Sequence, residues 1–261
     1  MTTFLETPAL ARLVEWIRAE ADPDFDFASP GPLPWCAMAV PVSQARTALV
    51  TTAGLHLTGD EPFRSLEERL GDTSFRVIPH GAAPSDLALN APYVDQRHIP
   101  RDPEVALPMR ALEAVHQRGL AGPPSRRHAS FTGGVVRPFP GLARSAEKLI
   151  AMLEEDGVQA VIFLPSCSLC VQTASLLARA VEAEGIPTVC LTLLPELSRI
   201  VGAPRTLALR FPYGAPGGDP GNAALHQSVL REALALLETA TEPGILTTSD
   251  LAWRRTPAPL A

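Results

Sequence analysis

Apolar positions recur at two distinct spacings along the 261-residue chain. Leu10, Val14 and Ile17 fall three or four residues apart, the spacing that places side chains on one face of a helix. Residues 160–164 (AVIFL) are instead continuously apolar, which is typical of a strand buried on both faces of a parallel sheet. The same criteria predict helices over residues 8–21, 61–70, 108–118, 141–156, 172–184 and 222–240. They predict strands over residues 46–57, 75–78, 160–164 and 188–194, with a further edge strand over residues 205–211.

The order of these elements predicts an α/β fold. From residue 141 onward, helices and strands alternate with short connections, which is the βαβ arrangement of a parallel sheet with right-handed crossovers. We therefore expect Rossmann- or flavodoxin-like units in two halves of similar construction. Residues 80–108 and 123–140 lack periodicity and are expected to be loops. The expected division is an N-terminal helix with a proline-rich lead-in (1–45), a first α/β half with a long loop (46–140), a second half (141–240) and a mobile tail (241–261).

The charge balance excludes several classes of partner. The chain has 22 Lys and Arg residues against 28 Asp and Glu residues, a formal charge of −6. Phosphate binding needs clustered basic residues, so this balance argues against a nucleic-acid surface. No stretch reaches the ~18 apolar residues of a membrane span, and the first helix carries acidic residues, unlike a signal peptide. We expect a cytoplasmic protein that binds neither nucleic acid nor a membrane.

The strongest chemical signal is the pair Cys167 and Cys170, which lies between a predicted core strand and a predicted helix. Ligands bind outside the carboxyl ends of parallel strands, and backbone N–H groups at a helix N-terminus favour a thiolate. Two sulfurs at this spacing can also form a disulfide, so the pair is suited to redox or nucleophilic chemistry. A structural zinc site and inert core packing are the alternatives. Cys190 is expected to pack in the core, and the role of Cys36 is left open.

Weaker candidates follow two other predicted strands. Thr51, Thr52 and His56 end the first strand with two hydroxyls and an imidazole, and Glu61 follows them. A plain strand-to-helix cap with Asp60 explains the same residues equally well. A second group is His128 and Ser130, which lie two residues apart before a glycine pair without the elbow of a serine hydrolase. The remaining histidines lack metal-ligand spacing, so we expect no metal site.

Taken together, several motifs resemble the selenoprotein B family of the glycine, sarcosine, betaine and D-proline reductases. The resemblance spans roughly residues 30–235 and keeps the order of the motifs. Beyond the cysteine pair with Gln172 and Thr173, the matching segments are 48–56 (ALVTTAGLH), 60–63 (DEPF), 71–79 (GDTSFRVIP), 128–133 (HASFTG), 155–158 (EDGV), 186–188 (IPT), 199–205 (RIVGAPR) and 210–217 (RFPYGAPG).

The resemblance implies roles for the two thiols. In those reductases the position of Cys167 is typically selenocysteine, and the pair cleaves a substrate C–N bond reductively and is left oxidised. Cys167 is thus the implied nucleophile and Cys170 the implied resolving thiol. A family cluster that carries a histidine is reduced here to Tyr93 and Asp95. The family's amino-acid reductases also use a pyruvoyl group on a separate partner subunit, which this chain does not resemble.

The leading hypothesis is a thiol-dependent reductase that cleaves a C–N or C–S bond of a small amino-acid-like or heterocyclic substrate. An external thiol or thioredoxin-like protein would regenerate the thiols, and the chain itself would carry no cofactor. Proton transfer is assigned to His56, Glu61 and His128. Substrate binding is assigned to Thr51, Thr52, Ser130, Tyr93, Asp95 and Arg210.

Three alternatives remain open at this point. The first is a redox-neutral desulfurase in which Cys167 carries a persulfide. The second is a subunit that is active only with a pyruvoyl partner, and the third is a metal-binding structural protein. We expect a small-molecule substrate, a possible reductase partner subunit and a homo-oligomer.

Overall fold

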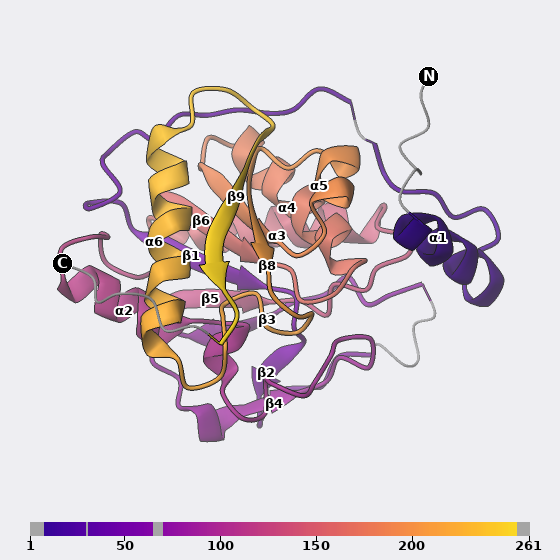
Figure 1. The fold of residues 1–261 in the computed structure, drawn as a ribbon, viewed down its shortest axis with the longest axis horizontal. Helices are drawn as coiled ribbons and strands as arrows, with labels where there is room; N and C mark the ends of the chain where they lie inside the picture. The colour runs from indigo at the N-terminus through magenta and orange to yellow at the C-terminus, as the bar shows by residue number, and fades with distance from the viewer. Residues whose placement is uncertain (1–7, 30, 65–69, 255–261) are drawn as a thin grey trace.

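A computed structural model describes residues 8–29, 31–64 and 70–254. Within these residues the chain forms a seven-stranded sheet in the order β3-β5-β1-β6-β7-β8-β9 (Figure 1). The sheet strands are β1 (Thr47–Thr51), β3 (Arg76–Pro79), β5 (Arg127–Ser130), β6 (Ala160–Leu164), β7 (Thr188–Thr192), β8 (Arg205–Arg210) and β9 (Ile245–Ala252). All neighbours are parallel except β3, which runs antiparallel to β5 at one edge. The predicted α/β fold with a mostly parallel sheet is confirmed.

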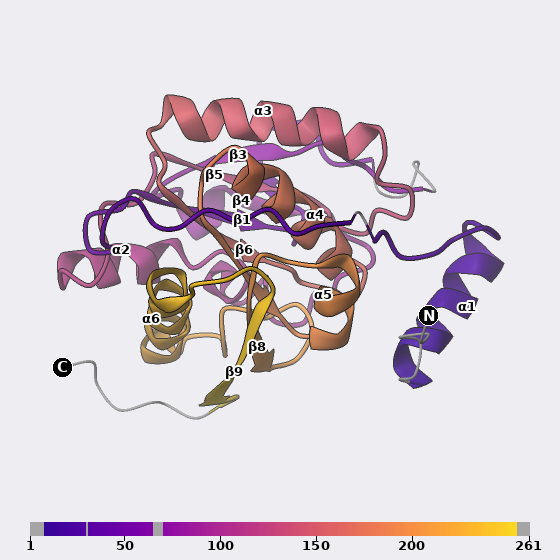
Figure 2. The ribbon, with the colours of Figure 1, turned by 90° about the horizontal axis from the view of Figure 1, so that it is seen from above.

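Helices cover both faces of this sheet. They are α1 (Pro8–Glu20), α2 (Met109–Gln117), α3 (Gly141–Glu155), α4 (Cys170–Ala183), α5 (Pro195–Val201) and α6 (Ala223–Thr239), with short 3-10 helices η1 (Pro84–Asp86) and η2 (Pro103–Val105). Figure 2 shows α3 and α6 on opposite sides of the sheet. None of the helices in the described ranges combines the length and the apolar character that a membrane crossing requires.

The alternation of side chains along β6 divides the core in two. Val161 and Phe163 belong to the cluster that contains the apolar residues of α1, α3 and α4. Ile162 and Leu164 belong to the opposite cluster, which contains those of α2 and α6. Because successive side chains of a strand point to opposite faces, a fully apolar strand must be covered on both sides. The continuous AVIFL run is therefore the sequence signature of the central layer.

Three expectations about residues 46–140 need correction. The strand predicted over residues 46–57 breaks after β1, since Gly54 adopts a φ of 71°. The chain then enters β2 (Leu55–Leu57), which pairs antiparallel with β4 (Leu87–Leu89) in a separate sheet. A Cβ at Gly54 would contact the backbone of Asn90, so this crossing requires glycine. The loops expected over 80–108 and 123–140 thus contain β4 and β5 respectively.

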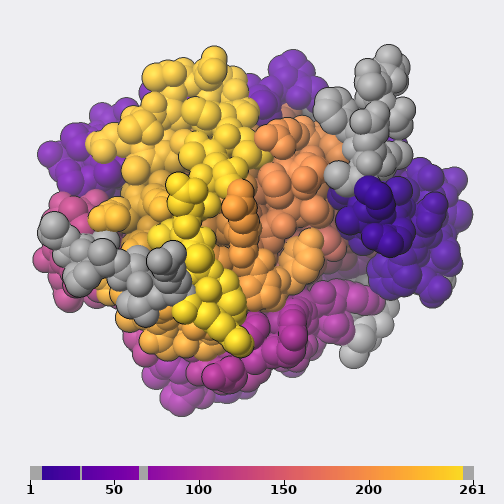
Figure 3. All heavy atoms as spheres, in the orientation of Figure 1, coloured from indigo at the N-terminus to yellow at the C-terminus, as the bar shows by residue number. Residues whose placement is uncertain are grey.

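The C-terminal prediction was also wrong. Residues 245–252 were assigned to a mobile tail, yet they form β9, which pairs with β8. Strand β8 is therefore an interior strand rather than the expected edge strand. The sequence of β9 (ILTTSDLA) lacks a regular alternation of apolar and polar residues, so its pairing with β8 rather than a local pattern makes it a strand. Figure 3 shows this C-terminal strand crossing the near face of the molecule, while α1 lies at its side.

Two further predictions concern a helix over residues 61–70 and the division of the chain into two halves. The helix expected over residues 61–70 has no regular structure at 61–64, and residues 65–69 lie outside the described residues. The two predicted halves, 46–140 and 141–240, meet in one sheet because β1 pairs with β6 over five residues. Their similarity and the proposed boundaries stay predictions.

A fully buried ion pair ties α4 to β7 and β8. The Glu182 carboxylate accepts a hydrogen bond from Arg205 at 2.7 Å, and both side chains are 0% exposed. The second carboxylate oxygen accepts from the backbone and the hydroxyl of Thr188 at 2.7 and 2.8 Å. The Arg205 guanidinium stacks on Trp35, 3.7 Å from the ring centroid. The lead-in segment is thereby fastened to the second half of the sheet.

We predict that Glu182→Gln destabilises the fold by about 3–5 kcal/mol, because it leaves the Arg205 charge buried without its counter-ion. Urea unfolding followed by circular dichroism measures this loss. Glu184→Gln is the matched control, since Glu184 lies two residues after Glu182 at the end of α4 and is exposed. Its effect should stay within about 0.5 kcal/mol. Equal stability of the two variants would contradict the structural role of the buried pair.

Candidate active site

The two cysteines of the CxxC motif lie where β6 passes into α4. Strand β6 ends at Leu164, and α4 begins at Cys170. Cys167 and Cys170 form a disulfide, with their Cα atoms 4.9 Å apart. The backbone N–H of Cys170 also donates to Cys167 Sγ at 3.1 Å. In the reduced protein this N–H and the positive end of the helix would stabilise a Cys167 thiolate.

Residues after two neighbouring strands hold this loop in place. The Thr52 hydroxyl accepts a hydrogen bond from the Ser166 backbone N–H at 3.1 Å. Cys170 Sγ lies 3.7 Å from the carbonyl oxygen of Thr52 and 3.9 Å from that of Thr132. Gly133 has a φ of 67°, and a Cβ there would meet Thr52 and the sulfur of Cys170. The ends of β1, β5 and β6 therefore converge on the disulfide, as expected for parallel strands.

The two sulfurs differ in their access to the surface. Cys167 is 7% exposed and lines a cavity of about 170 Å³, whereas Cys170 is 0% exposed and does not line it. A substrate in this cavity would meet Cys167 first. Cys170 could then act only on a group already attached to Cys167. The geometry agrees with the order of attack implied by the resemblance.

One wall of the cavity comes from the opposite end of the sequence. Helix α1 contributes an apolar wall to it, and the rest comes from Tyr93, the segment after β5 and the 167–169 loop. The lining residues are Leu13, Trp16, Ile17, Ala21, Tyr93, Gly134, Val136, Cys167, Ser168 and Leu169. Tyr93 is thus the predicted substrate-binding residue that the fold brings to Cys167.

Contacts at the end of α1 hold this wall against the body. The Asp22 carboxylate pairs with Arg137, whose Nη2 lies 2.7 Å from Asp22 Oδ1, and this guanidinium lowers the pKa of Asp22. The Gln172 side chain accepts from the Ala28 backbone N–H at 2.8 Å. The sequence reasoning missed the role of α1. The sequence feature that could have indicated this role is Trp16, a large apolar residue outside the buried face of an amphipathic helix. Its side chain is 53% exposed.

Two predicted proton donors lie away from this cavity. His56 belongs to β2 and packs edge-on against Phe63, with its Nδ1 3.4 Å from the Gly54 carbonyl oxygen. Glu61 is exposed and pairs with Arg64 at 3.2 Å. Neither side chain lines the cavity beside Cys167. Their assignment to proton transfer at Cys167 has no support in the geometry.

The other predicted binding residues do not line the cavity beside Cys167. The hydroxyl of Thr51 accepts from the Ala53 backbone N–H at 3.2 Å, and that of Ser130 is buried without a hydrogen-bond partner. Asp95 pairs with Arg97, which lowers the pKa of the Asp95 carboxyl. Arg210 is exposed at the end of β8. Of the predicted binding set, only Tyr93 reaches the cavity, while Thr52 supports the cysteine loop.

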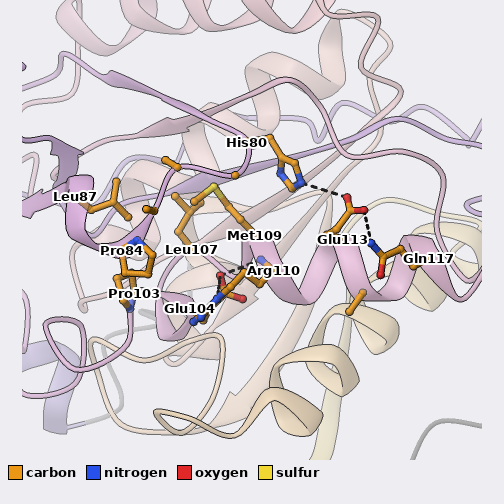
Figure 4. A pocket seen from close by; sticks show the side chains of 14 residues that line it. His80, Pro84, Leu87, Pro103, Glu104, Leu107, Met109, Arg110, Glu113 and Gln117 are labelled. Atoms are coloured by element: carbon orange, nitrogen blue, oxygen red, sulfur yellow. Dashed lines mark hydrogen bonds and ion pairs between the residues drawn. The ribbon is translucent and has the colours of Figure 1, made fainter.

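His128 belongs to a different cluster. Its Nδ1 accepts from the Leu49 backbone N–H at 3.0 Å, so its Nε2 carries the proton and donates to His80 Nδ1 at 2.9 Å. His80 Nε2 in turn lies 3.4 Å from a carboxylate oxygen of Glu113 (Figure 4). Burial is the main cause that lowers the pKa of His128 to about 3, so this imidazole is neutral. His128 faces away from the disulfide and cannot supply a proton there.

The His80 cluster borders a second cavity of about 260 Å³, which is drawn in Figure 4. Leu87, Leu107 and Met109 form its apolar part. His80 follows β3 at the level of Arg127, the first residue of β5, whereas the cysteines follow the carboxyl end of β6. The two cavities therefore lie at opposite ends of the sheet.

The remaining thiols are not activated. Burial and the nearby Glu182 carboxylate raise the pKa of Cys36 to about 12, and burial also raises the pKa of Cys190. The predicted core role of Cys190 agrees with this environment. Among the described residues, no group of three or more His, Cys, Asp or Glu side chains is placed to hold a metal ion.

Comparison with known proteins finds similar chains among amino-acid reductase subunits. The chain is 28% identical to D-proline reductase subunit gamma of Acetoanaerobium sticklandii over 203 residues, which cover 78% of this chain and 82% of that protein. It is 26% identical to sarcosine reductase complex component B subunit beta of Peptoclostridium acidaminophilum, over 77% of this chain and 47% of that protein. It is 25% identical to glycine reductase complex component B subunit gamma of the same organism, over 90% of this chain and 55% of that protein. The chain is therefore similar to subunits of the D-proline, sarcosine and glycine reductases, which confirms the resemblance drawn from the ordered motifs.

The matched region covers different shares of these relatives. It spans about half the length of the sarcosine and glycine reductase subunits and most of the D-proline reductase subunit. No protein-family model and no solved structure matches it. These relatives are named as subunits or components of reductases, which are oxidoreductases.

We predict that the buried neutral His128 makes the fold less stable in acid. Its pKa lies near 6.5 when unfolded and at about 3 when folded, so the unfolded chain binds the extra proton between these values. The free energy of unfolding should therefore fall as pH decreases from 6.5 toward 3, with this site contributing up to ~1.4 kcal/mol per pH unit.

Urea unfolding of the oxidised protein between pH 7.5 and 4.5 measures this slope. His128→Asn should flatten it, whereas His116→Gln, which changes a histidine outside the cluster, should leave it unchanged. Parallel pH profiles for the wild type and His128→Asn would contradict the prediction.

Proposed function

We propose that the chain is a thiol-dependent reductase that cleaves a C–N or C–S bond of a small amino-acid-like or heterocyclic substrate. Cys167 is the nucleophile, and Cys170 is the resolving thiol. An external thiol or a thioredoxin-like protein returns the resulting disulfide to two thiols. The observation that carries this proposal is the asymmetry of the pair, because Cys167 lines a cavity and Cys170 is buried behind it.

The chemistry takes two displacement steps. The Cys167 thiolate attacks the substrate carbon and forms a C–S bond, and the departing nitrogen or sulfur takes up a proton. The Cys170 thiolate then attacks Cys167 Sγ, which breaks that C–S bond and leaves its electron pair on carbon, where a second proton is added. Two thiols become one disulfide, and the substrate gains two electrons and two protons in total. The carbanion formed in the second step requires an adjacent electron-withdrawing group in the substrate.

Proton donors for these steps must come from the cavity wall. His56, Glu61 and His128 have their side chains elsewhere, so we assign proton delivery to the hydroxyls of Tyr93 and Ser168, which line the cavity. Thr52 acts by positioning, since its hydroxyl holds the Ser166 backbone N–H just before Cys167.

The names of the relatives favour a second possibility, that this chain works as one subunit of a larger reductase. The relatives are named as a subunit of D-proline reductase and as components of sarcosine and glycine reductase complexes. A partner would then supply the pyruvoyl group that the sequence resemblance implies for amino-acid substrates. Activity toward D-proline, sarcosine or glycine that appears only after a pyruvoyl-bearing partner is added would establish this arrangement.

The electron balance separates a reductase from a redox-neutral desulfurase. The reduced chain is incubated without reductant and with D-proline, sarcosine, glycine or a small thione, and free thiols are counted before and after reaction. A reductase loses two thiols per turnover and forms the Cys167–Cys170 disulfide. A desulfurase instead releases stoichiometric sulfide from the thione with both thiols recovered, which would contradict the proposal.

We predict that Cys167→Ser and Cys170→Ser each lower turnover by at least ~100-fold, because a serine hydroxyl is a far weaker nucleophile than a thiolate and cannot form the disulfide. Product formation with excess dithiothreitol measures the effect. Cys36→Ser is the matched control, since the Cys36 thiol donates a hydrogen bond to Glu182 and does not line the cavity. Full turnover in either variant of the pair would remove that cysteine from its assigned role.

A further inference from the structure

The cavity beside Cys167 is walled by uncharged groups. Helix α1 contributes Leu13, Trp16 and Ile17, and Val136 and Leu169 contribute further apolar surface. Its polar groups are the hydroxyls of Tyr93 and Ser168 and the sulfur of Cys167. No Asp, Glu, Lys, Arg or His is among the described residues that line it. A substrate seated against Cys167 therefore meets apolar side chains and two neutral hydroxyls.

Two charged pairs near these wall residues in sequence are balanced internally, and the Arg18 guanidinium on α1 donates to the Phe25 carbonyl oxygen rather than lining the cavity. Asp22 comes after the α1 wall and pairs with Arg137, which comes after Val136. Asp95 lies two residues beyond Tyr93 and pairs with Arg97. Each pair is charge-balanced, so neither offers a free counter-ion to a ligand. A carboxylate or an ammonium group entering this cavity would lose water without gaining a charged side chain as a counter-ion, which disfavours binding.

From this lining we propose that the cavity takes a neutral ring compound of about six to ten non-hydrogen atoms, rather than a free amino-acid zwitterion. The size follows from the volume of about 170 Å³, since an apolar cavity of ~150 Å³ binds benzene. The aromatic faces of Trp16 and Tyr93 suit a planar ring. This inference rests on the proposed function and narrows its substrate to a neutral ring that carries the C–N or C–S bond.

Protection of Cys167 from alkylation tests the charge preference without requiring turnover. The fully reduced chain is treated with iodoacetamide in the presence of benzamide or benzoate, which match in size and shape but differ in charge. Peptide mass spectrometry follows Cys167, with Cys36 as the internal reference. Benzamide should slow alkylation of Cys167 by about tenfold or more, whereas benzoate at the same concentration should leave the rate nearly unchanged.

Two variants locate the effect in the cavity. Trp16→Ala removes one wall and should abolish most of the benzamide protection. Trp253→Ala changes a tryptophan that packs on His98 and Phe211 and does not line the cavity, so it should leave the protection intact. Leu13→Lys places a cation at the wall and should confer protection by benzoate. Because Trp16 is half exposed, the fold should tolerate its truncation.

The outcomes separate this inference from the proposed function. Equal protection by the two probes, no protection by either, or stronger protection by benzoate would overturn the neutral-ring assignment. Oxidation of the pair by a zwitterion in the isolated chain would overturn it too, while supporting the reductase. Protection by benzamide that responds to Trp16→Ala and Leu13→Lys as expected would support the assignment even where no tested compound oxidises the two thiols.

Discussion

The parallel pairing of β1 with β6 is the constraint on which the rest of the molecule depends. It aligns Thr47–Thr51 with Ala160–Leu164 over five residues, so both strands end at the same level. Thr52 and Ser166 follow at that level and share a hydrogen bond. The cysteine loop is thus anchored to the centre of the sheet. A slip of this register would separate the loop from Thr52 and turn every side chain of β6 to the wrong face.

This anchoring explains how an irregular loop can hold a reactive pair. The loop between β6 and α4 places Cys167 one turn ahead of the helix, where the Cys170 N–H reaches its sulfur. Gly133 permits the close approach of the segment after β5, since any side chain there would meet Cys170. The sulfur of Cys170 is therefore enclosed by backbone, while that of Cys167 keeps one open side. That difference in burial is the basis of the roles proposed for the two thiols.

Helix α1 turns the open side of Cys167 into a cavity. The helix is amphipathic because Leu10, Val14 and Ile17 must be buried, and they are packed with Leu169 in one apolar cluster. The Asp22–Arg137 pair fastens its end. A substrate must therefore fit between a segment near the N-terminus and a loop some 150 residues further along. Substrate shape is in this way decided by elements that are unrelated in sequence.

The sequence by itself determined the elements whose causes are local. The AVIFL run and the apolar repeats of α1, α3 and α6 predicted the layers, and the CxxC motif was correctly placed at a strand–helix junction. Only the tertiary structure decided that His128 bonds His80, that residues 245–252 join β8, and that Trp16 and Cys167 line the same cavity. Periodicity records which side of an element is buried, whereas the partner on that side depends on how distant segments pack.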